Sequence, residues 1–262
     1  IYSVTDFFIT SACLVGTETT IGGFSGFDPK GTPVFERARR AMQYADNIDE
    51  WAAIMVEHNS GAYANSWLLG DIKTNEIARL ELGLKHHSIE KKKTGYFHGS
   101  NVTSNMKVLR EETEATYDDI RISPVARRER WKQLMRTHNG KISAEIAKKM
   151  LADHYDVYEG QEKPGLRTIC GHGEWDDGRI PGGGPWGAYC PAGALDGKVV
   201  DSKMAQSWQF WAKWGSSCDR DFRADQFLER HTQYDWLDGH LKDLPAESWT
   251  IFPKEKQQSA SG

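Results

Sequence analysis

The side chains best suited to covalent chemistry in this sequence are four cysteines, at positions 13, 170, 190 and 218. A reactive thiolate needs an accessible, electropositive setting. Cys13 instead lies in the apolar stretch FFITSACLV, which predicts a strand, so we interpret it as a small buried hydrophobe and not as a nucleophile. No two cysteines have C-x-x-C spacing, which argues against zinc, while one or two disulfides stay open.

A second group that could do chemistry is His172, which is followed by Glu174 and Asp176 in CGHGEWDD. A histidine with two carboxylates can hold a catalytic metal, so one hypothesis is a metal-dependent hydrolase that uses these three residues. The spacing is weak, and the other histidines of the chain do not improve it. We interpret His172 as a structural or pocket-lining residue that contributes to substrate binding, and we predict no metal and no cofactor.

Two charged residues are predicted at buried positions. Arg128 precedes Trp131 and Met135 at helical spacing, so it points toward the core face of a predicted helix. A buried arginine needs an anionic partner, which is either a carboxylate or phosphate of a substrate or a structural ion pair. Glu18 lies among threonines in a predicted strand and could pair with an arginine inside the protein. We predict that both residues contribute to substrate binding.

Two β-hairpins are predicted to position these residues. Residues 5–21 contain two runs of apolar and β-branched residues, with a turn near Ser11–Ala12. Residues 66–83 form the second hairpin, with its turn at 73–75. In its return strand apolar and polar residues alternate, which predicts one dry face and one wet face. The dry face carries Ala78, Leu80 and Leu82.

The rest of the chain is predicted to mix helices and further strands. Helices are expected from Pro33, from about Ile48, from Ser123–Pro124 and over 142–150, with a short one at 222–231. Residues 85–101 predict two strands, joined at 91–95. Residues 194–202 and 207–215 predict strands, or a strand and an aromatic helical turn. Segregated helices around antiparallel strands indicate the α+β class and not alternating βαβ units.

Composition limits the function classes. The 262 residues are 39% hydrophobic with a net charge of -4, which gives no indication of binding to nucleic acid or an anionic membrane. No run approaches the roughly 18 apolar residues of a transmembrane helix. We predict one domain over 1–262, with a polar tail at 253–262. An oligomer is an open option, and a secreted, periplasmic or lysosomal location is favoured over the cytoplasm.

Three stretches carry a family resemblance. They are DFFITSACLVGTETTI, then NSGAYANSWLLGDIKTNEIARLELGL with YFHGSN, then TICGHGEWDD with AGALDGKVVDSKMAQSWQFWAKWG. Together they resemble the phospholipase B-like proteins and the related acyl-coenzyme A:6-aminopenicillanate acyltransferase-like hydrolases. These are N-terminal nucleophile hydrolases, so the resemblance implies a four-layer αββα sandwich and self-cleavage that frees an N-terminal cysteine.

In the family the nucleophilic cysteine precedes the hairpin that corresponds to residues 5–21. We therefore expect Ile1 to begin a fragment, or one chain of a processed protein, that lacks the first strands and the nucleophile. The alternative is that the sequence simply starts at an ordered residue. The partner implied is an upstream segment or chain that carries the cysteine, and residues 1–262 alone are expected to be inactive. The family uses its α-amino group as the base, so no histidine is required.

The resemblance also implies roles for two polar residues. Asn101 falls where the family has an asparagine of the oxyanion hole, at the end of a predicted strand. The alternatives are a turn asparagine or a glycan acceptor in Asn101-Val102-Thr103. Thr10 falls where relatives commonly have a second asparagine that binds the oxyanion. Threonine has a shorter reach, and the alternative is an ordinary β-branched strand residue.

Two main functions follow from the resemblance. The first is a cysteine-type hydrolase or acyltransferase that acts on amide or ester bonds of small acylated substrates, with lipids as one option. The second is a non-catalytic binding or scaffold protein on the same fold, which the threonine at position 10 favours. The aromatic stretch SWQFWAKW suits a lipid or aromatic acyl group, and it suits an ordinary core equally well.

Overall fold

A computed structural model describes residues 6–179 and 187–253. The chain divides into two compact units, Ile1–Gly140 and Lys141–Gly262, which are described separately. All strand pairs in the sheets of the described residues are antiparallel, and helices accompany them, so the predicted α+β class is confirmed. The single-domain organisation stays a prediction. The predicted polar tail lies outside the described residues from position 254 onward.

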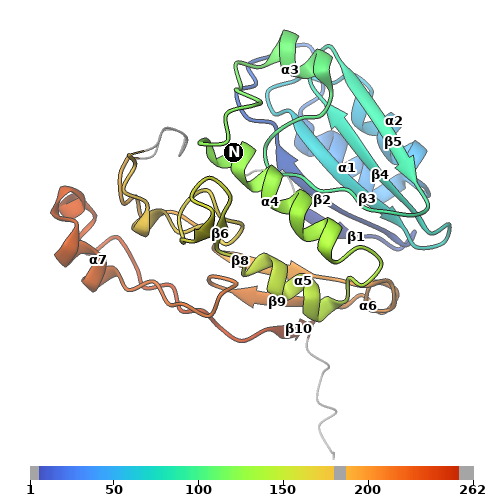
Figure 1. The fold of residues 1–262 in the computed structure, drawn as a ribbon. Helices are drawn as coiled ribbons and strands as arrows, with labels where there is room; N and C mark the ends of the chain where they lie inside the picture. The colour runs from blue at the N-terminus through green and yellow to red at the C-terminus, as the bar shows by residue number, and fades with distance from the viewer. Residues whose placement is uncertain (1–5, 180–186, 254–262) are drawn as a thin grey trace, which may run out of the picture. The chain divides into compact units, whose positions relative to one another are not determined.

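The first unit is built on a five-stranded antiparallel sheet in sequence order (Figure 1). Its strands are β1 (Phe7–Ile9), β2 (Leu14–Thr20), β3 (Asn65–Asp71), β4 (Glu76–Leu82) and β5 (His87–Lys92). The hairpins predicted at 5–21 and 66–83 are therefore confirmed as β1–β2 and β3–β4. Because β2 also pairs with β3 along its whole length, both hairpins belong to one sheet.

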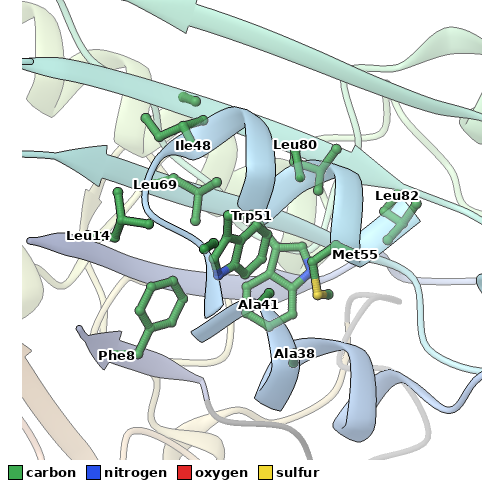
Figure 2. Packing of buried hydrophobic residues seen from close by; sticks show 14 residues of the cluster. Phe8, Leu14, Ala38, Ala41, Ile48, Trp51, Met55, Leu69, Leu80 and Leu82 are labelled. Atoms are coloured by element: carbon green, nitrogen blue, oxygen red, sulfur yellow. The ribbon is translucent and has the colours of Figure 1, made fainter. Parts of the chain in front are cut away.

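One face of this sheet packs against helices α1 (Val34–Tyr44) and α2 (Ile48–Val56). Ala78, Leu80 and Leu82 are buried there, which confirms the dry face predicted for the return strand. Figure 2 shows Trp51 of α2 at the centre of this core. Its ring stacks on Phe8 at 5.7 Å and meets Trp67 edge-on at 5.1 Å. These contacts tie α2 to β1 and β3.

The opposite face of the sheet is polar but is also covered. Glu81 is 3% exposed and Ser66 is 2% exposed, so the face that the alternation predicts to be wet is dry at its centre. Glu81 Oε1 accepts hydrogen bonds from the Ser66 hydroxyl at 3.0 Å and from the backbone N–H of Ser104 at 2.7 Å. Buried carboxylates need such partners. Ser66 of β3 supplies one of these partners, and Ser104, which follows β5, supplies the other from a segment that covers this face.

Two features of the first unit differ from the sequence prediction. Cys13 lies in the β1–β2 turn with φ of 60°, not inside a strand, because the chain reverses there and needs a left-handed residue. The second strand predicted within 85–101 does not form. Residues 93–105 are irregular, with Gly95 and Asn101 at positive φ, before helices α3 (Met106–Glu112) and α4 (Ser123–Thr137).

The second unit has less regular structure. A three-stranded sheet has the order β10–β9–β8, and β6 and β7 form a two-residue pair. The strands predicted at 194–202 and 207–215 are confirmed as β8 and β9, and the helix at 222–231 as α7. The elements are α5 (Ala144–Leu151), β6 (Tyr155–Asp156), β7 (Gln161–Glu162), η1 (Gly173–Trp175), β8 (Asp196–Val199), α6 (Ser202–Gln206), β9 (Phe210–Trp214), α7 (Ala224–Arg230), η2 (Thr232–Leu237) and β10 (Thr250–Phe252).

None of the helices in the described residues combines the length and the apolar composition that crossing a bilayer requires.

Candidate functional site

Asn101 is fixed against the C-terminal end of β2. Its backbone N–H donates to the Thr19 hydroxyl at 2.9 Å, and its side-chain Nδ2 donates to the Thr20 carbonyl at 2.8 Å. Its own carbonyl accepts from the N–H of Gly22 at 3.0 Å. The φ of 66° is tolerated by asparagine better than by most residues. The prediction that Asn101 ends a strand is therefore wrong, because the residue lies in irregular structure with a left-handed backbone and is held by β2.

Arg127 of α4 fixes the other end of the same amide. Its Nη2 donates to Asn101 Oδ1 at 2.8 Å, and its Nε donates to the Ser123 hydroxyl at 3.1 Å. Burial lowers the pKa of Arg127 to about 10, so it remains a cation at neutral pH. With Oδ1 facing a guanidinium and Nδ2 facing a carbonyl, only one orientation of the amide satisfies both partners. The site is thus preorganised.

Thr10 lies at the opposite end of β2 from Asn101. The Thr10 hydroxyl accepts from the N–H of Leu14, the first residue of β2, at 3.2 Å. Asn101 binds Thr19 and Thr20, the last residues of that strand. At ~3.3 Å per residue the two sites are about 20 Å apart along the strand. The structure therefore does not bring the two predicted oxyanion donors together, and Thr10 closes the β1–β2 turn.

Glu18 forms a separate polar cluster on the face of the sheet that carries the core. The Tyr63 hydroxyl contacts Glu18 Oε1 at 3.5 Å and the Thr20 hydroxyl at 2.5 Å. Glu18 Oε2 is buried without a hydrogen-bond partner among the described residues. Burial, together with the nearby carboxylate of Asp6, raises the pKa of Glu18 to about 7. The arginine partner considered for Glu18 is not among its described contacts, so its carboxyl is only partly ionised near neutrality.

Asn65 is a residue of this region that the sequence reasoning missed. It pairs with Thr20 across the β2–β3 ladder and is 1% exposed. Neither its side-chain oxygen nor its nitrogen has a hydrogen-bond partner among the described residues. A fully buried amide without partners is costly. The only sequence signal was a polar residue at the start of an otherwise apolar strand.

A pH-dependent stability is expected from Glu18. Its carboxyl holds a proton more tightly in the folded protein, so its contribution to stability is fully present below a pH of about 4.5. That contribution is lost as the pH rises through about 7. Relative to wild type, Glu18→Gln should therefore gain melting temperature progressively from about pH 5 to about pH 8. Glu57→Gln, at an exposed glutamate, is the matched control. Parallel pH profiles for wild type and Glu18→Gln would show that Glu18 is not desolvated.

Arg128 is placed on α4 with an unused donor. Its Nε donates to Glu129 at 2.9 Å, and its guanidinium carbon lies 4.0 Å from the centre of the Tyr117 ring. Its Nη1 is buried without a hydrogen-bond partner among the described residues. Arg128 therefore forms the predicted structural ion pair with Glu129. It also keeps a donor for an anion, because Glu129 contacts only the Nε side of the guanidinium.

The surroundings of Arg128 are cationic. Burial and the charges of Arg79, Lys132 and Arg128 lower the pKa of His98 to about 4, so this histidine is neutral near pH 7. Its Nδ1 is also buried and unpaired among the described residues. An anionic group placed here would gain from the net positive potential and from the free Nη1 donor. The sequence analysis predicts substrate binding by Arg128, and it does not single out His98.

His172 belongs to the second unit and lies in a cluster of side chains. Its Nε2 is 3.4 Å from Cys170 Sγ and 3.3 Å from Cys218 Sγ, and its Nδ1 is 2.9 Å from Glu174 Oε1. Burial opposes its charging, yet the contacts with Cys218 and Glu174 raise the pKa of His172 to about 9. Both ring nitrogens are thus engaged, which leaves neither for the substrate contact predicted for this residue.

His154 completes this cluster, and one atom from each of His154, Cys170, His172 and Cys218 lies within 4.8 Å of the others. The structure does not group His172 with Glu174 and Asp176 as metal ligands. The Asp176 carboxylate instead accepts the backbone N–H of Leu166 at 3.1 Å and that of Gly178 at 3.0 Å. In the part of the chain that the structure describes, the residues grouped closely enough to hold a metal are therefore two cysteines and two histidines.

Comparison with known proteins shows similarity to phospholipase B. The phospholipase B family model matches residues 1–112, which include Glu18, Asn65 and Asn101. The chain is 23% identical over 273 aligned residues to phospholipase B of Crotalus adamanteus, covering 98% of this chain and 44% of that protein. It is 37% identical over 78 residues to putative phospholipase B-like 1 of Caenorhabditis elegans, covering 28% of this chain and 14% of that protein.

The chain thus spans less than half the length of the curated relatives that it matches. The three matches agree with one another and with the resemblance that the sequence motifs predict. The predicted resemblance is therefore confirmed, because residues 1–112 match the phospholipase B family model.

Proposed function

We propose that the protein is an N-terminal nucleophile hydrolase or acyltransferase that cleaves ester or amide bonds of small acylated substrates, lipids in particular. The observation that carries this proposal is the preorganised Asn101 amide at the end of β2, within the residues that match phospholipase B. A side-chain amide held by a carbonyl and a guanidinium keeps its direction before charge develops, as an oxyanion donor must.

The proposed reaction uses a cysteine that lies outside residues 1–262. The α-amino group of this cysteine takes the thiol proton, and the resulting thiolate attacks the acyl carbonyl carbon. A C–S bond forms, and the π electron pair of the carbonyl moves onto oxygen. One Nδ2 hydrogen of Asn101 already binds Thr20, and the second donates to this oxyanion. The intermediate then expels the alcohol or amine, which takes a proton from the α-amino group of the cysteine. Water, or an acceptor in acyl transfer, releases the acyl group from the thioester.

The fold inferred for the complete protein is the αββα sandwich. In this arrangement the β1–β5 sheet forms one β layer and α1 with α2 forms the adjoining α layer. The proposal places the second β layer on the far face of that sheet. In this proposal the upstream segment completes the site, and residues 1–262 alone are inactive.

Arg128 is proposed to bind an anionic group of the substrate, such as a phosphate. Arg128→Met keeps a flexible apolar stem over Tyr117 but removes the donors. A lost charge-assisted hydrogen bond is worth about 1.5–3 kcal/mol, so KM for a phosphate-bearing substrate should rise by roughly 10- to 150-fold. The turnover number should change little. The measurement is steady-state kinetics on a phospholipid and on a neutral acyl ester, and an equal loss for both would contradict the assignment.

The proposed activity is tested with the complete encoded protein. It is incubated with phosphatidylcholine, lysophosphatidylcholine and a neutral N-acyl amide, and released fatty acid is quantified by mass spectrometry. The expected result is release from at least one of these substrates, reduced by Asn101→Gly. If no substrate is cleaved while lipid binding persists, the scaffold function favoured by Thr10 replaces the enzymatic one.

A further inference from the structure

The Cys170–His172–Cys218 contacts have the spacing of ligands around one metal ion. In a tetrahedral zinc site with Zn–S of about 2.3 Å and Zn–N of about 2.0 Å, sulfur and nitrogen ligands lie about 3.5 Å apart. His172 Nε2 lies 3.4 Å and 3.3 Å from the two sulfurs. The remaining ligand atom, from His154, is within 4.8 Å of all three. We propose that His154, Cys170, His172 and Cys218 bind a zinc ion.

The surroundings of His172 fit a metal ligand. Its Nδ1 meets Glu174 Oε1 at 2.9 Å, and a carboxylate at this position commonly orients a ligating histidine. The Trp175 ring stacks on the imidazole at 4.4 Å with an interplanar angle of 13°, which fixes the ring plane. Both interactions hold Nε2 toward the two sulfurs. Zinc binding at Nε2 therefore needs no rearrangement of His172.

The other ligands are held as firmly. The Cys170 N–H donates to the carbonyl of Asp153 at 3.0 Å, which joins the Cys170 segment directly to the residue before His154. His154 Nε2 is buried and has no hydrogen-bond partner among the described residues. An unpartnered buried imidazole nitrogen is costly unless something occupies it. A cation between the four side chains would satisfy it.

The ligand chemistry selects zinc and a structural role. Two thiolates with two imidazoles form a Cys₂His₂ set, which favours zinc over the hard cations that prefer oxygen. Four protein ligands complete a tetrahedron, so no position stays open for a reacting water. The zinc would stabilise the second unit, and this inference does not depend on the function proposed for Asn101.

The second unit has little apolar core of its own, so a metal link would add to its stability. Both hydrophobic core clusters found in the described residues are built from the first unit alone. In the second unit the described residues 154–179 and 187–193 have only two-residue strands and one short 3₁₀ helix. The proposed ligands join this stretch to Cys218, which follows β9. Small units with little apolar core are often held by metals or disulfides.

The first experiment is metal analysis of the full chain purified without chelators from zinc-supplemented medium. We expect about one zinc per chain by inductively coupled plasma mass spectrometry. Cys170→Ser and Cys218→Ser should retain less than about a tenth of that amount. Cys190→Ser is the matched control, because Cys190 is a buried cysteine of the same unit outside the cluster, and it should keep its zinc.

A second experiment stays informative if the cysteine variants fail to fold. Wild-type protein is stripped with a chelator and reloaded with cobalt(II). The expected spectrum has a thiolate-to-cobalt charge-transfer band and the intense d–d absorption of tetrahedral cobalt. The chelator should lower the melting temperature, and added zinc should restore it. Glu174→Gln should weaken zinc binding by roughly 10- to 100-fold in a chelator competition without abolishing it.

Two results would overturn the proposal. One is a Cys170–Cys218 disulfide in the native protein, recognised as a mass lower by two hydrogens that reduction restores, with no metal present. The other is reduced cysteines that bind neither zinc nor cobalt, which would leave Cys218 and His172 as a metal-free thiol–imidazole pair.

Discussion

Replacing Asn101 by glycine is expected to lower the rate of acyl transfer to the nucleophile by about 100- to 1000-fold, the usual effect of losing one oxyanion donor. Substrate binding should change much less, because the donor matters chiefly once charge develops on the carbonyl oxygen. Glycine is the appropriate replacement because Asn101 has a φ of 66°. Alanine would add backbone strain of about 1 kcal/mol or more to the loss of the amide.

Single-turnover kinetics with a chromogenic acyl substrate measures this effect, with a melting curve of each variant alongside. Asn101→Asp should be as inactive as the glycine variant or more so, because it places negative charge beside the oxyanion. Ser104→Ala, at another polar residue of the same irregular segment, is a suitable control. Full turnover by Asn101→Gly, or a loss explained by unfolding alone, would leave Asn101 as a turn residue without a catalytic role.

Truncating Trp51 to alanine should lower the free energy of unfolding of the first unit by about 3–5 kcal/mol. The side chain is fully buried, and its ring contacts with Phe8 and Trp67 tie α2 to the sheet (Figure 2). Since natural domains are stable by only about 5–15 kcal/mol, this loss should populate unfolded chains. Chemical denaturation followed by far-UV circular dichroism measures it.

Trp51→Phe keeps an aromatic ring in the core, so its effect on stability can be compared with that of removing the whole ring. The indole Nε1 is buried without a hydrogen-bond partner among the described residues, so phenylalanine removes an unsatisfied donor while it creates only a small cavity. Its cost should be well below that of alanine. Trp236→Ala, at a tryptophan that is 69% exposed, should change stability by less than about 0.5 kcal/mol. Equal costs for Trp51→Ala and Trp236→Ala would contradict the assignment of the core.

The sequence predicted the hairpins well, because strand alternation is a local pattern that the structure retains. Ala78, Leu80 and Leu82 face the core as their period requires. The sequence prediction was wrong where the backbone reverses direction. Cys13 and Asn101 both adopt positive φ, which residue propensities do not predict. Glu81 shows a further limit, since alternation predicts polarity but not whether another segment covers the polar face.

The candidate sites were predictable to different degrees. The position of Asn101 followed from the family resemblance, but its partner Arg127 did not, because helix periodicity directs attention to Arg128 on the core face. The metal cluster was missed for a different reason. Its ligands run from His154 to Cys218 and share no short motif, so only the folded chain brings them together. Such long-range groupings depend on tertiary structure that no local pattern encodes.

The most direct test of the proposed function is to trap the acyl-enzyme. The complete protein is mixed with a labelled acyl substrate, quenched in acid during turnover and mapped by peptide mass spectrometry. The account predicts one acyl group, carried by a cysteine outside residues 1–262. An acyl group on Cys13, Cys170, Cys190 or Cys218 would contradict it.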